Sequence, residues 1–281
     1  MLRGLYTGWT GMVNEQKRLD VISNNMANAD TVGFKDDRVT SQAFDQVLAI
    51  KVRDGSEAYH NEAIGHLSLG VKIGEVYTDY SQGSIRQTGN SLDVALSGSG
   101  FFTVNVTDKN GNVHTRYTRN GQFTLTKDGL LVDSEGNAVQ GQGGDIHIPT
   151  DAKNISISAN GVITADGQNI DTLKLVDFED YDYLKKYGDT MYEPVDGATE
   201  KATSAQTIQG YTEQSNVNVV KEMVDMHHGT IKVTSEPEAG SRFVVTLPLQ
   251  KEVFEQDSQV EFILNDSQSP ATRPDSCLQT E

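Results

Sequence analysis

The sequence predicts a mainly β protein with α-helices at its two ends. Three observations favour this class: an apolar heptad stripe near the amino terminus, turn dipeptides between alternating segments in the middle, and a shorter helical stripe near residue 220. At 281 residues the chain is long enough to bury a core, and its length permits one large domain or two medium ones.

The first expected element is an amino-terminal helix within residues 1–35. Its apolar side chains recur at heptad spacing, with others three or four residues away, as in a coiled-coil seam. The expected seam residues are Leu2, Leu5, Trp9, Met12, Leu19, Ile22 and Met26. The helix should end within "SNNMANADTVGF", where Asn and Ser compete for backbone hydrogen bonds and Gly33 permits a left-handed turn. The stripe could pack on another helix or on its own domain.

Residues 36–80 show weak periodicity and are expected to form an irregular connection, with a short helix or strand within 41–52. An antiparallel β domain is expected at 81–205. There, alternating segments such as "FFTVNV" and "NISIS" are separated by Asn-Gly and Asp-Gly pairs. No helical stretch intervenes, so a βαβ nucleotide-binding sheet is not expected. Gly98, Gly100 and Gly121 are interpreted as turn formers and not as ligand contacts.

The start of a carboxy-terminal helix is expected within 206–226, capped by Ser215. Its apolar positions form a second stripe, suited to lie against the first: Val217, Val220, Met223, Val224 and Met226. The helix has room for only about three turns, which is marginal for a helix alone. After it, residues 227–250 are expected to form a β-hairpin, and residues 251–281 a mobile tail rich in Ser, Gln and Asp.

Bulk composition excludes several classes of partner. The sequence has 23 Lys and Arg against 40 Asp and Glu, a formal charge of −17, which repels nucleic acid and anionic lipid. No apolar run is long enough to insert in a membrane, and the amino end lacks a signal-peptide pattern. The single cysteine, Cys277, allows no intramolecular disulfide or thiolate cluster. No metal, cofactor, small-molecule ligand or catalytic residue is expected.

Three stretches resemble the flagellar basal-body rod and hook family, and its rod subunits in particular. They are "NNMANADTVGFK" (24–35), with Met26 where Leu is usual; "SQGSIRQTGNSLDVALSGSGFFTV" (81–104) with "YTRNGQFTLTKDGLLVDSEGNAVQG" (117–141); and "QGYTEQSNVNVVKEMVDM" (209–226). Together they span about four fifths of the chain in the family's order.

The resemblance implies a structural subunit that passes through the flagellar export apparatus without a cleaved signal peptide. Such a subunit stacks with copies of itself and other rod or hook subunits into the axial drive shaft of the basal body. The two terminal helices would pair in an inner coiled coil, with the β domain outside. By the same resemblance, Asn24, Asn25 and Asn28 form the polar end of the first helix, bonding within the chain or between subunits. Gly33 and Phe34 form the turn and anchor at its exit.

The segment "HHGTIKVTSEPEAGSRFVVTLPLQ" (227–250) departs from that family and resembles the last hairpin of the ATP-binding domain of sensor histidine kinases. This predicts a join between two genes near residues 220–226, which would leave the carboxy-terminal helix truncated, the amino-terminal helix loosely docked or frayed, and polymerisation impaired.

Two alternatives to a rod subunit stay open at this point. One is a fragment of a sensor histidine kinase in two-component signalling, although the kinase's phosphorylated histidine and nucleotide boxes do not precede His227. The other is a secreted carbohydrate-binding β module, which would have no use for the helix stripes.

Overall fold

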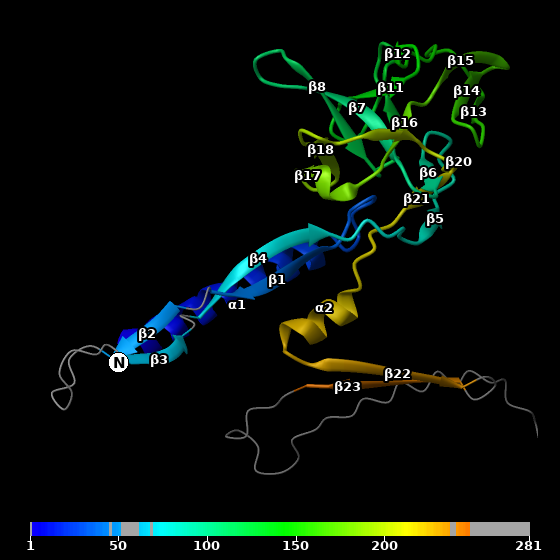
Figure 1. Ribbon diagram of the computed structural model, residues 1–281. Helices are drawn as coiled ribbons and strands as arrows, with labels where there is room; N and C mark the ends of the chain where they lie inside the picture. Colours follow the sequence, from blue (N-terminus) through cyan, green and yellow to red (C-terminus); the bar gives the residue numbers. More distant parts are fainter. Residues whose placement is uncertain (1, 45–46, 52–61, 68–69, 237–239, 248–281) are drawn as a thin grey trace, which may run out of the picture. The chain divides into compact units, whose positions relative to one another are not determined.

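The computed structural model describes residues 2–44, 47–51, 62–67, 70–236 and 240–247. These fall into two compact units, one ending at Val219 and one beginning at Val220 (Figure 1). The expected fold class is confirmed. Strands dominate, a long helix opens the chain, and a short helix precedes a final hairpin.

The amino-terminal helix α1 (Leu2–Ala27) ends within the expected stretch. The N–H of Asn28 bonds back to the carbonyls of Asn24 and Asn25, at 3.1 Å each. Strand β1 (Asp37–Ala43) pairs antiparallel with β4 (Val71–Thr78), and α1 lies along this two-stranded ribbon (Figure 1).

The irregular connection expected at 36–80 is wrong, because it contains four strands, although one of them lies within 41–52, where a short helix or strand was expected. Besides β1 and β4, strand β2 (Val47–Lys51) pairs with β3 (Glu62–Leu67). The ribbon escapes sequence analysis because β1 reads "DRVTSQA", with one large apolar residue. The paired residues lie 28 to 41 positions apart along the chain, and such long-range pairing leaves no local signal.

The central domain is built on a ten-stranded sheet in which β17-β18-β8-β7-β11-β10-β9 form a continuous path. Strand β12 pairs with β11, and β16 pairs with both β7 and β19. The strands of this sheet are β7 (Phe101–Thr107), β8 (Val113–Thr118), β9 (Thr124–Leu125), β10 (Leu131–Val132), β11 (Ala138–Gly141), β12 (Gly144–Asp145), β16 (Leu175–Phe178), β17 (Leu184–Tyr187), β18 (Met191–Pro194) and β19 (Glu200–Ala202).

A smaller sheet, β13-β14-β15, and the 3₁₀ turn η1 complete the domain between residues 155 and 183. Their bounds are β13 (Ile155–Ile157), β14 (Val162–Ala165), β15 (Gln168–Thr172) and η1 (Tyr181–Tyr183). Every strand pair in the described part of the chain is antiparallel, as closely spaced turn dipeptides predict.

Two short strand pairs extend the β region beyond the expected end at 205. Strand β6 (Val94–Ser97) pairs with β20 (Gln206–Gln209), and β5 (Ile85–Gln87) pairs with β21 (Tyr211–Glu213). Residues 206–213 are therefore strands, and not the approach to a helix as expected.

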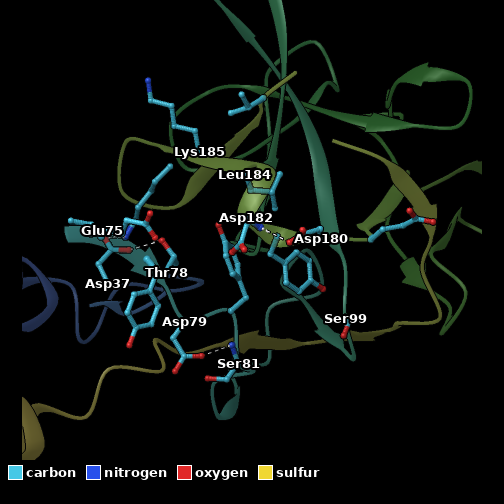
Figure 2. A pocket seen from close by; sticks show the side chains of 17 residues that line it. Asp37, Glu75, Thr78, Asp79, Ser81, Ser99, Asp180, Asp182, Leu184 and Lys185 are labelled. Atoms are coloured by element: carbon cyan, nitrogen blue, oxygen red, sulfur yellow. Dashed lines mark hydrogen bonds and ion pairs between the residues drawn. The ribbon is translucent and has the colours of Figure 1, made fainter. Parts of the chain in front are cut away.

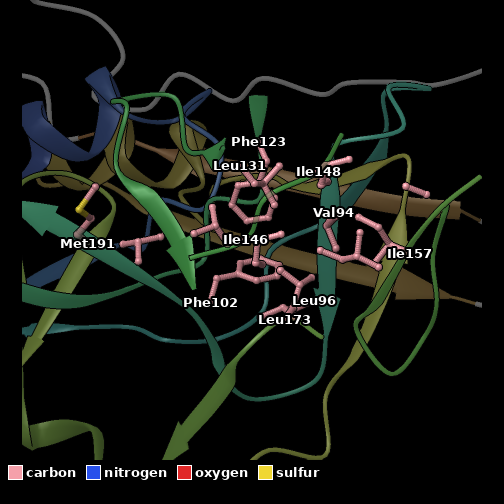
Figure 3. Close-up of a cluster of buried hydrophobic side chains, with 14 residues drawn as sticks. Val94, Leu96, Phe102, Phe123, Leu131, Ile146, Ile148, Ile157, Leu173 and Met191 are labelled. Carbon is pink, nitrogen blue, oxygen red and sulfur yellow. The ribbon is translucent and has the colours of Figure 1, made fainter. Parts of the chain in front are cut away.

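The larger of two apolar clusters in the domain is shown in Figure 3, and the second contains Phe101, Tyr117, Val176, Phe178, Leu184 and Tyr192. Phe102 and Phe123 meet edge to face in the larger cluster, with ring centroids 5.1 Å apart. Gly121 closes the turn beside them, where a Cβ atom would lie 1.7 Å from the carbonyl oxygen of Val94. Other members of the larger cluster are Val94, Leu96, Val104, Leu131, Val139, Ile146, Ile148, Ile157, Ile163 and Leu173.

The second unit contains most of α2 (Val219–Met226) and an antiparallel hairpin of β22 (Thr230–Glu236) and β23 (Gly240–Thr246). The expected cap at Ser215 is wrong: its Oγ accepts from the N–H of Val217, at 3.2 Å, and α2 begins only at Val219. Seam residue Val217 therefore precedes the helix. The predicted tail at 251–281, with Cys277, lies outside the described residues.

Helix α1 docks on the ribbon through polar side chains, so the expected loose or frayed helix is wrong. Thr10, Asn14 and Asn25 are buried on this face together with Ile22. The amide of Asn14 donates to Ser41 Oγ at 3.0 Å. That of Asn25 donates to Asp36 Oδ1 and to the carbonyl oxygen of Asp37, and its Oδ1 accepts from the Asp37 N–H. Buried polar groups are stable only when they are bonded in this way.

We predict that Asn25→Ala loosens the end of α1. The substitution leaves the buried Asp36 carboxylate and the Asp37 N–H short of a partner, at about 1.5–3 kcal/mol for a hydrogen bond to a charged group. Amides in the second half of α1 should exchange roughly ten- to a hundredfold faster in hydrogen-exchange measurements. The neighbouring Asn24→Ala, at an exposed position, is the matched control. Equal exchange in the two variants would contradict this role for Asn25.

Candidate assembly site

The apolar stripe of α1 faces solvent. Leu5 is 72% exposed, Trp9 54%, Met12 67% and Leu19 42%. The side chain of Leu2 lies outside the described residues. Of the other seam residues, Ile22 is buried against the first unit and Met26 is half-buried. The structure therefore keeps four predicted seam residues together on one exposed face and turns Ile22 inward.

This arrangement reverses the usual polarity of a surface helix, which buries its apolar face and exposes its polar one. At 3.6 residues per turn, Leu5, Met12 and Leu19 lie on the side of α1 opposite Thr10 and Asn14. The polar side is the one bonded to the ribbon. An apolar stripe left over after the first unit has folded marks an interaction surface.

The shorter helix α2 also exposes apolar side chains. Val220 is 59% exposed and Met223 is 47% exposed, whereas Val224 is buried in the second unit. Val217, before the helix, and Met226, at its end, are half-buried. The predicted second seam therefore has two of its five residues on an exposed helical face.

Of the three asparagines expected at the polar end of α1, Asn25 and Asn28 form side-chain hydrogen bonds within the chain. Asn25 holds the ribbon as described above. The amide of Asn28 donates to the carbonyl oxygen of Asn24 at 3.1 Å, and its Oδ1 accepts from Thr31 at 3.0 Å. The side chain of Asn24 is exposed. Asn25 and Asn28 thus stabilise the bend at the end of α1, which was one of the two expectations for them.

Gly33 and Phe34 fix the exit from that bend. Gly33 has φ of 74°, and a Cβ atom there would lie 2.4 Å from the backbone nitrogen of Asn120. Its N–H donates to the carbonyl oxygen of Glu213 at 2.8 Å. Phe34 is fully buried, with Lys186 Nζ 3.9 Å from its ring centroid. Only glycine fits a left-handed backbone this close to another chain segment.

A buried ion cluster joins three distant parts of the first unit directly after this turn. The carboxylate of Glu213 accepts from Lys35 Nζ at 2.5 Å, from the N–H of Gly83 at 2.9 Å and from Arg119 at 3.0 Å. Lys35 and Glu213 are fully buried, and the Arg119 side chain is 4% exposed. We call Lys35, Arg119 and Glu213 the ion hub. It connects the amino-terminal segment, the sheet and the last strand of the domain.

Backbone carbonyls accept further hydrogen bonds from the two cations of the ion hub, whereas the buried Nε of Arg119 has no partner among the described residues. Lys35 also donates to the carbonyl oxygen of Ser81 at 2.7 Å, and Arg119 donates to that of Gly98 at 2.9 Å. Burial lowers the pKa of Lys35, and attraction to Glu213 opposes this shift. Buried ions are tolerated in proteins only when they are paired and hydrogen-bonded, as these are.

Asn216 supports the ion hub from the carboxy-terminal side. Its Oδ1 accepts from the N–H of Asp36 at 2.8 Å, and its amide donates to the carbonyl oxygen of Asp79 at 2.7 Å. None of the predicted site residues belongs to this group of Lys35, Arg119, Glu213 and Asn216. One feature of the sequence could have pointed to the ion hub. Each of the three stretches that resemble the rod family contains one of its charged residues: Lys35 ends the first stretch, Arg119 lies in the middle one and Glu213 lies in the last.

We predict that Glu213→Gln lowers the free energy of unfolding of the first unit by about 3–5 kcal/mol, because two buried cations lose their carboxylate. Urea unfolding followed by circular dichroism measures the change. Glu135→Gln, at an exposed turn position, removes the same charge and should stay within roughly 0.5 kcal/mol of the parent chain. A loss no larger in Glu213→Gln than in this control would contradict the structural role of the hub.

His227 and His228 come directly after α2. His227 Nδ1 is 2.8 Å from the carbonyl oxygen of Met223, and His228 adopts a φ of 54°. In the described part of the chain, no three or more His, Cys, Asp or Glu side chains gather as a metal site would require. None of the helices described there has the length and apolar character needed to cross a membrane.

Comparisons with known proteins match the same three regions. Family models match at residues 5–35 (flagella basal body rod protein), 95–165 (flagellar hook protein FlgE/F/G D1 domain) and 208–227 (flagellar basal body rod FlgEFG protein C-terminal). The flagellar basal-body rod protein FlgG of Bacillus subtilis strain 168 is 36% identical over 250 residues, covering 80% of this chain and 89% of its own.

Other relatives agree. FlgG of Agrobacterium fabrum is 34% identical over 243 residues, covering 80% of this chain and 89% of its own. The flagellar basal-body rod protein FlgF of Caulobacter vibrioides is 31% identical over 228 residues, covering 80% of this chain and 87% of its own. With this identity, coverage and order of matched regions, the chain belongs to the flagellar basal-body rod protein family.

Proposed function

We propose that this protein is a structural subunit of the flagellar rod and that it polymerises through the exposed stripe of α1. The observation that carries the proposal is the reversed polarity of α1, whose polar side is bonded inside the first unit. Leu5, Trp9 and Met12 are left for a neighbouring subunit. Family membership supports a location in the basal body and assembly with copies of itself and with other rod or hook subunits.

The stripe is large enough to drive association. Burial of a large apolar side chain contributes about 1.5–3 kcal/mol. Four such residues that are about half exposed or more supply several kcal/mol for each contact, before the entropy lost on association is counted. A helical polymer repeats this contact at every subunit, so a modest gain at each contact is sufficient.

The role proposed here is structural and not catalytic. Membership of a family whose matched relatives are rod proteins supports this role. We also propose that the subunit reaches the rod through the flagellar export apparatus. The rod family membership of the chain is again what supports this.

We predict that Leu5→Gln with Met12→Gln abolishes polymerisation and leaves the fold intact. Both side chains are mostly exposed in the subunit, so folding loses little, whereas the contact between subunits loses two apolar side chains. Sedimentation and light scattering measure polymer formation, and circular dichroism measures folding. Lys17→Gln, at an exposed position of the same helix outside the stripe, is the control. Normal polymerisation of the double variant would show that the stripe is not the contact.

We further propose that the carboxy-terminal part of the assembly seam is shortened. Helix α2 is eight residues long and a hairpin comes directly after it. The family-model match to the carboxy-terminal region ends at residue 227. The predicted gene join near 220–226 stays a prediction, as does the likeness of 227–250 to a histidine kinase hairpin. A single unbroken genomic read across codons 215–235 tests the join, and calorimetric titration with ATP and magnesium tests the kinase alternative.

With the shortened seam we predict weak complementation of motility. Expressed in a strain that lacks its own rod subunit of this kind, the chain should restore less swimming than the native subunit does, because fewer apolar residues cover α1. Swimming zones in soft agar measure the effect, with export checked by immunoblotting of the basal-body fraction. Full restoration would show that α2 and the hairpin after it support assembly as they are.

A further inference from the structure

A groove of 1320 Å³ runs between strand β4 and the η1–β17 segment of the sheet domain, both in the first unit (Figure 2). Residues Glu75 to Ser81 line one wall, and Glu179 to Lys186 line much of the other. The proposed assembly through α1 does not involve this groove, since no residue of α1 lines it.

Apolar and aromatic side chains are exposed along the groove. Val76 is 56% exposed, and Tyr77 and Val195 are each 47% exposed. Tyr80 and Tyr181 lie deeper in it, with ring centroids 4.9 Å apart. Among the described residues, β4 pairs only with β1, so its other edge has no strand beside it. Exposed apolar side chains beside an unpaired strand edge are typical of a surface that binds an extended segment.

The charge of the groove indicates that the bound segment is cationic. Six carboxylates and two lysines line the groove. Two of the carboxylates have cationic partners: Asp37 bonds Lys186 at 2.7 Å, and Asp79 bonds Arg38 at 3.0 Å. Glu75, Glu179 and Asp182 have no ion-pair partner among the described residues. Tyrosine faces attract guanidinium and ammonium groups, and they add to the attraction of these carboxylates for a cation.

We propose that this groove binds an extended cationic segment of a different protein, with arginine or lysine alternating with apolar residues. A basic segment matches the six carboxylates of the groove better than a second copy of this chain does, since this chain has 40 Asp and Glu against 23 Lys and Arg. An alternating segment can place apolar side chains on Val76 and Val195 and its cations on the carboxylates.

The test titrates the full chain with a blocked octapeptide of alternating arginine and valine, and with its lysine and glutamate counterparts, by calorimetry at low salt. We expect the arginine peptide to bind at micromolar concentration, the lysine peptide several-fold more weakly, and the glutamate peptide not at all. The triple variant Glu75→Gln, Glu179→Gln, Asp182→Asn should weaken binding about tenfold. Tyr77→Ser should weaken the arginine peptide about threefold and reduce its advantage over lysine.

The matched control is Asp128→Asn, Glu135→Gln, Asp151→Asn, which removes three exposed carboxylates that do not line the groove. It should change the dissociation constant less than about twofold, since screened charges at a distance contribute little. An equal loss in the control and groove variants would mean that binding follows net charge only, and this would overturn the proposal. So would a lack of binding by the parent chain, or self-association in ultracentrifugation that the groove variant removes. The last outcome would make a second copy the occupant.

Discussion

The fold of the first unit depends on one carboxylate. Glu213 is fully buried, and both its oxygens accept from cations that are themselves removed from water. Without it, Lys35 and Arg119 would be buried cations that lack a paired carboxylate, and an unpaired buried ion costs several kcal/mol. The three residues come from the start, the middle and the end of the unit. The segment leaving α1 therefore cannot dock correctly until the last strand is in place. A buried ion pair is modest as a source of net stability, but it selects one arrangement of chain segments over others.

The positions of the neighbouring segments depend on the ion hub. The turn at Gly33 approaches the backbone of Asn120 and bonds the carbonyl of Glu213, so it forms only beside the ion hub. Asn216 then bonds both Asp36 and the end of β4. The ribbon, α1 and the groove are thereby fixed to the sheet domain as one body. Every contact named here lies before Val219. These contacts are therefore all made by residues of the first unit itself.

Sequence periodicity predicted the elements whose signal is local. The heptad stripe gave α1, alternation between Gly-containing turns gave the sheet domain, and alternation in 230–247 gave the final hairpin. The β1–β4 ribbon was missed because its stability comes from pairing between distant segments and from α1, and neither leaves a local period. The predicted helix cap at Ser215 was wrong because Asn216 hydrogen-bonds the backbone of Asp36 and Asp79. The helix therefore begins only after this residue. The ion hub could not be derived, since three charges far apart in sequence do not reveal that they meet.

The orientation of α1 leaves apolar surface exposed that can be buried when subunits assemble. Hydrophobic burial is non-directional, and alone it would turn Leu5 and Met12 toward the ribbon. Hydrogen bonds are directional, and those of Asn14 and Asn25 fix the rotation of the helix about its axis. They hold the polar side inward because the ribbon presents matched partners in Ser41 and Asp37. The apolar side is consequently excluded from the subunit's own core. Between 42% and 72% of the surface of Leu5, Trp9, Met12 and Leu19 stays exposed, and this surface remains for contact with another chain.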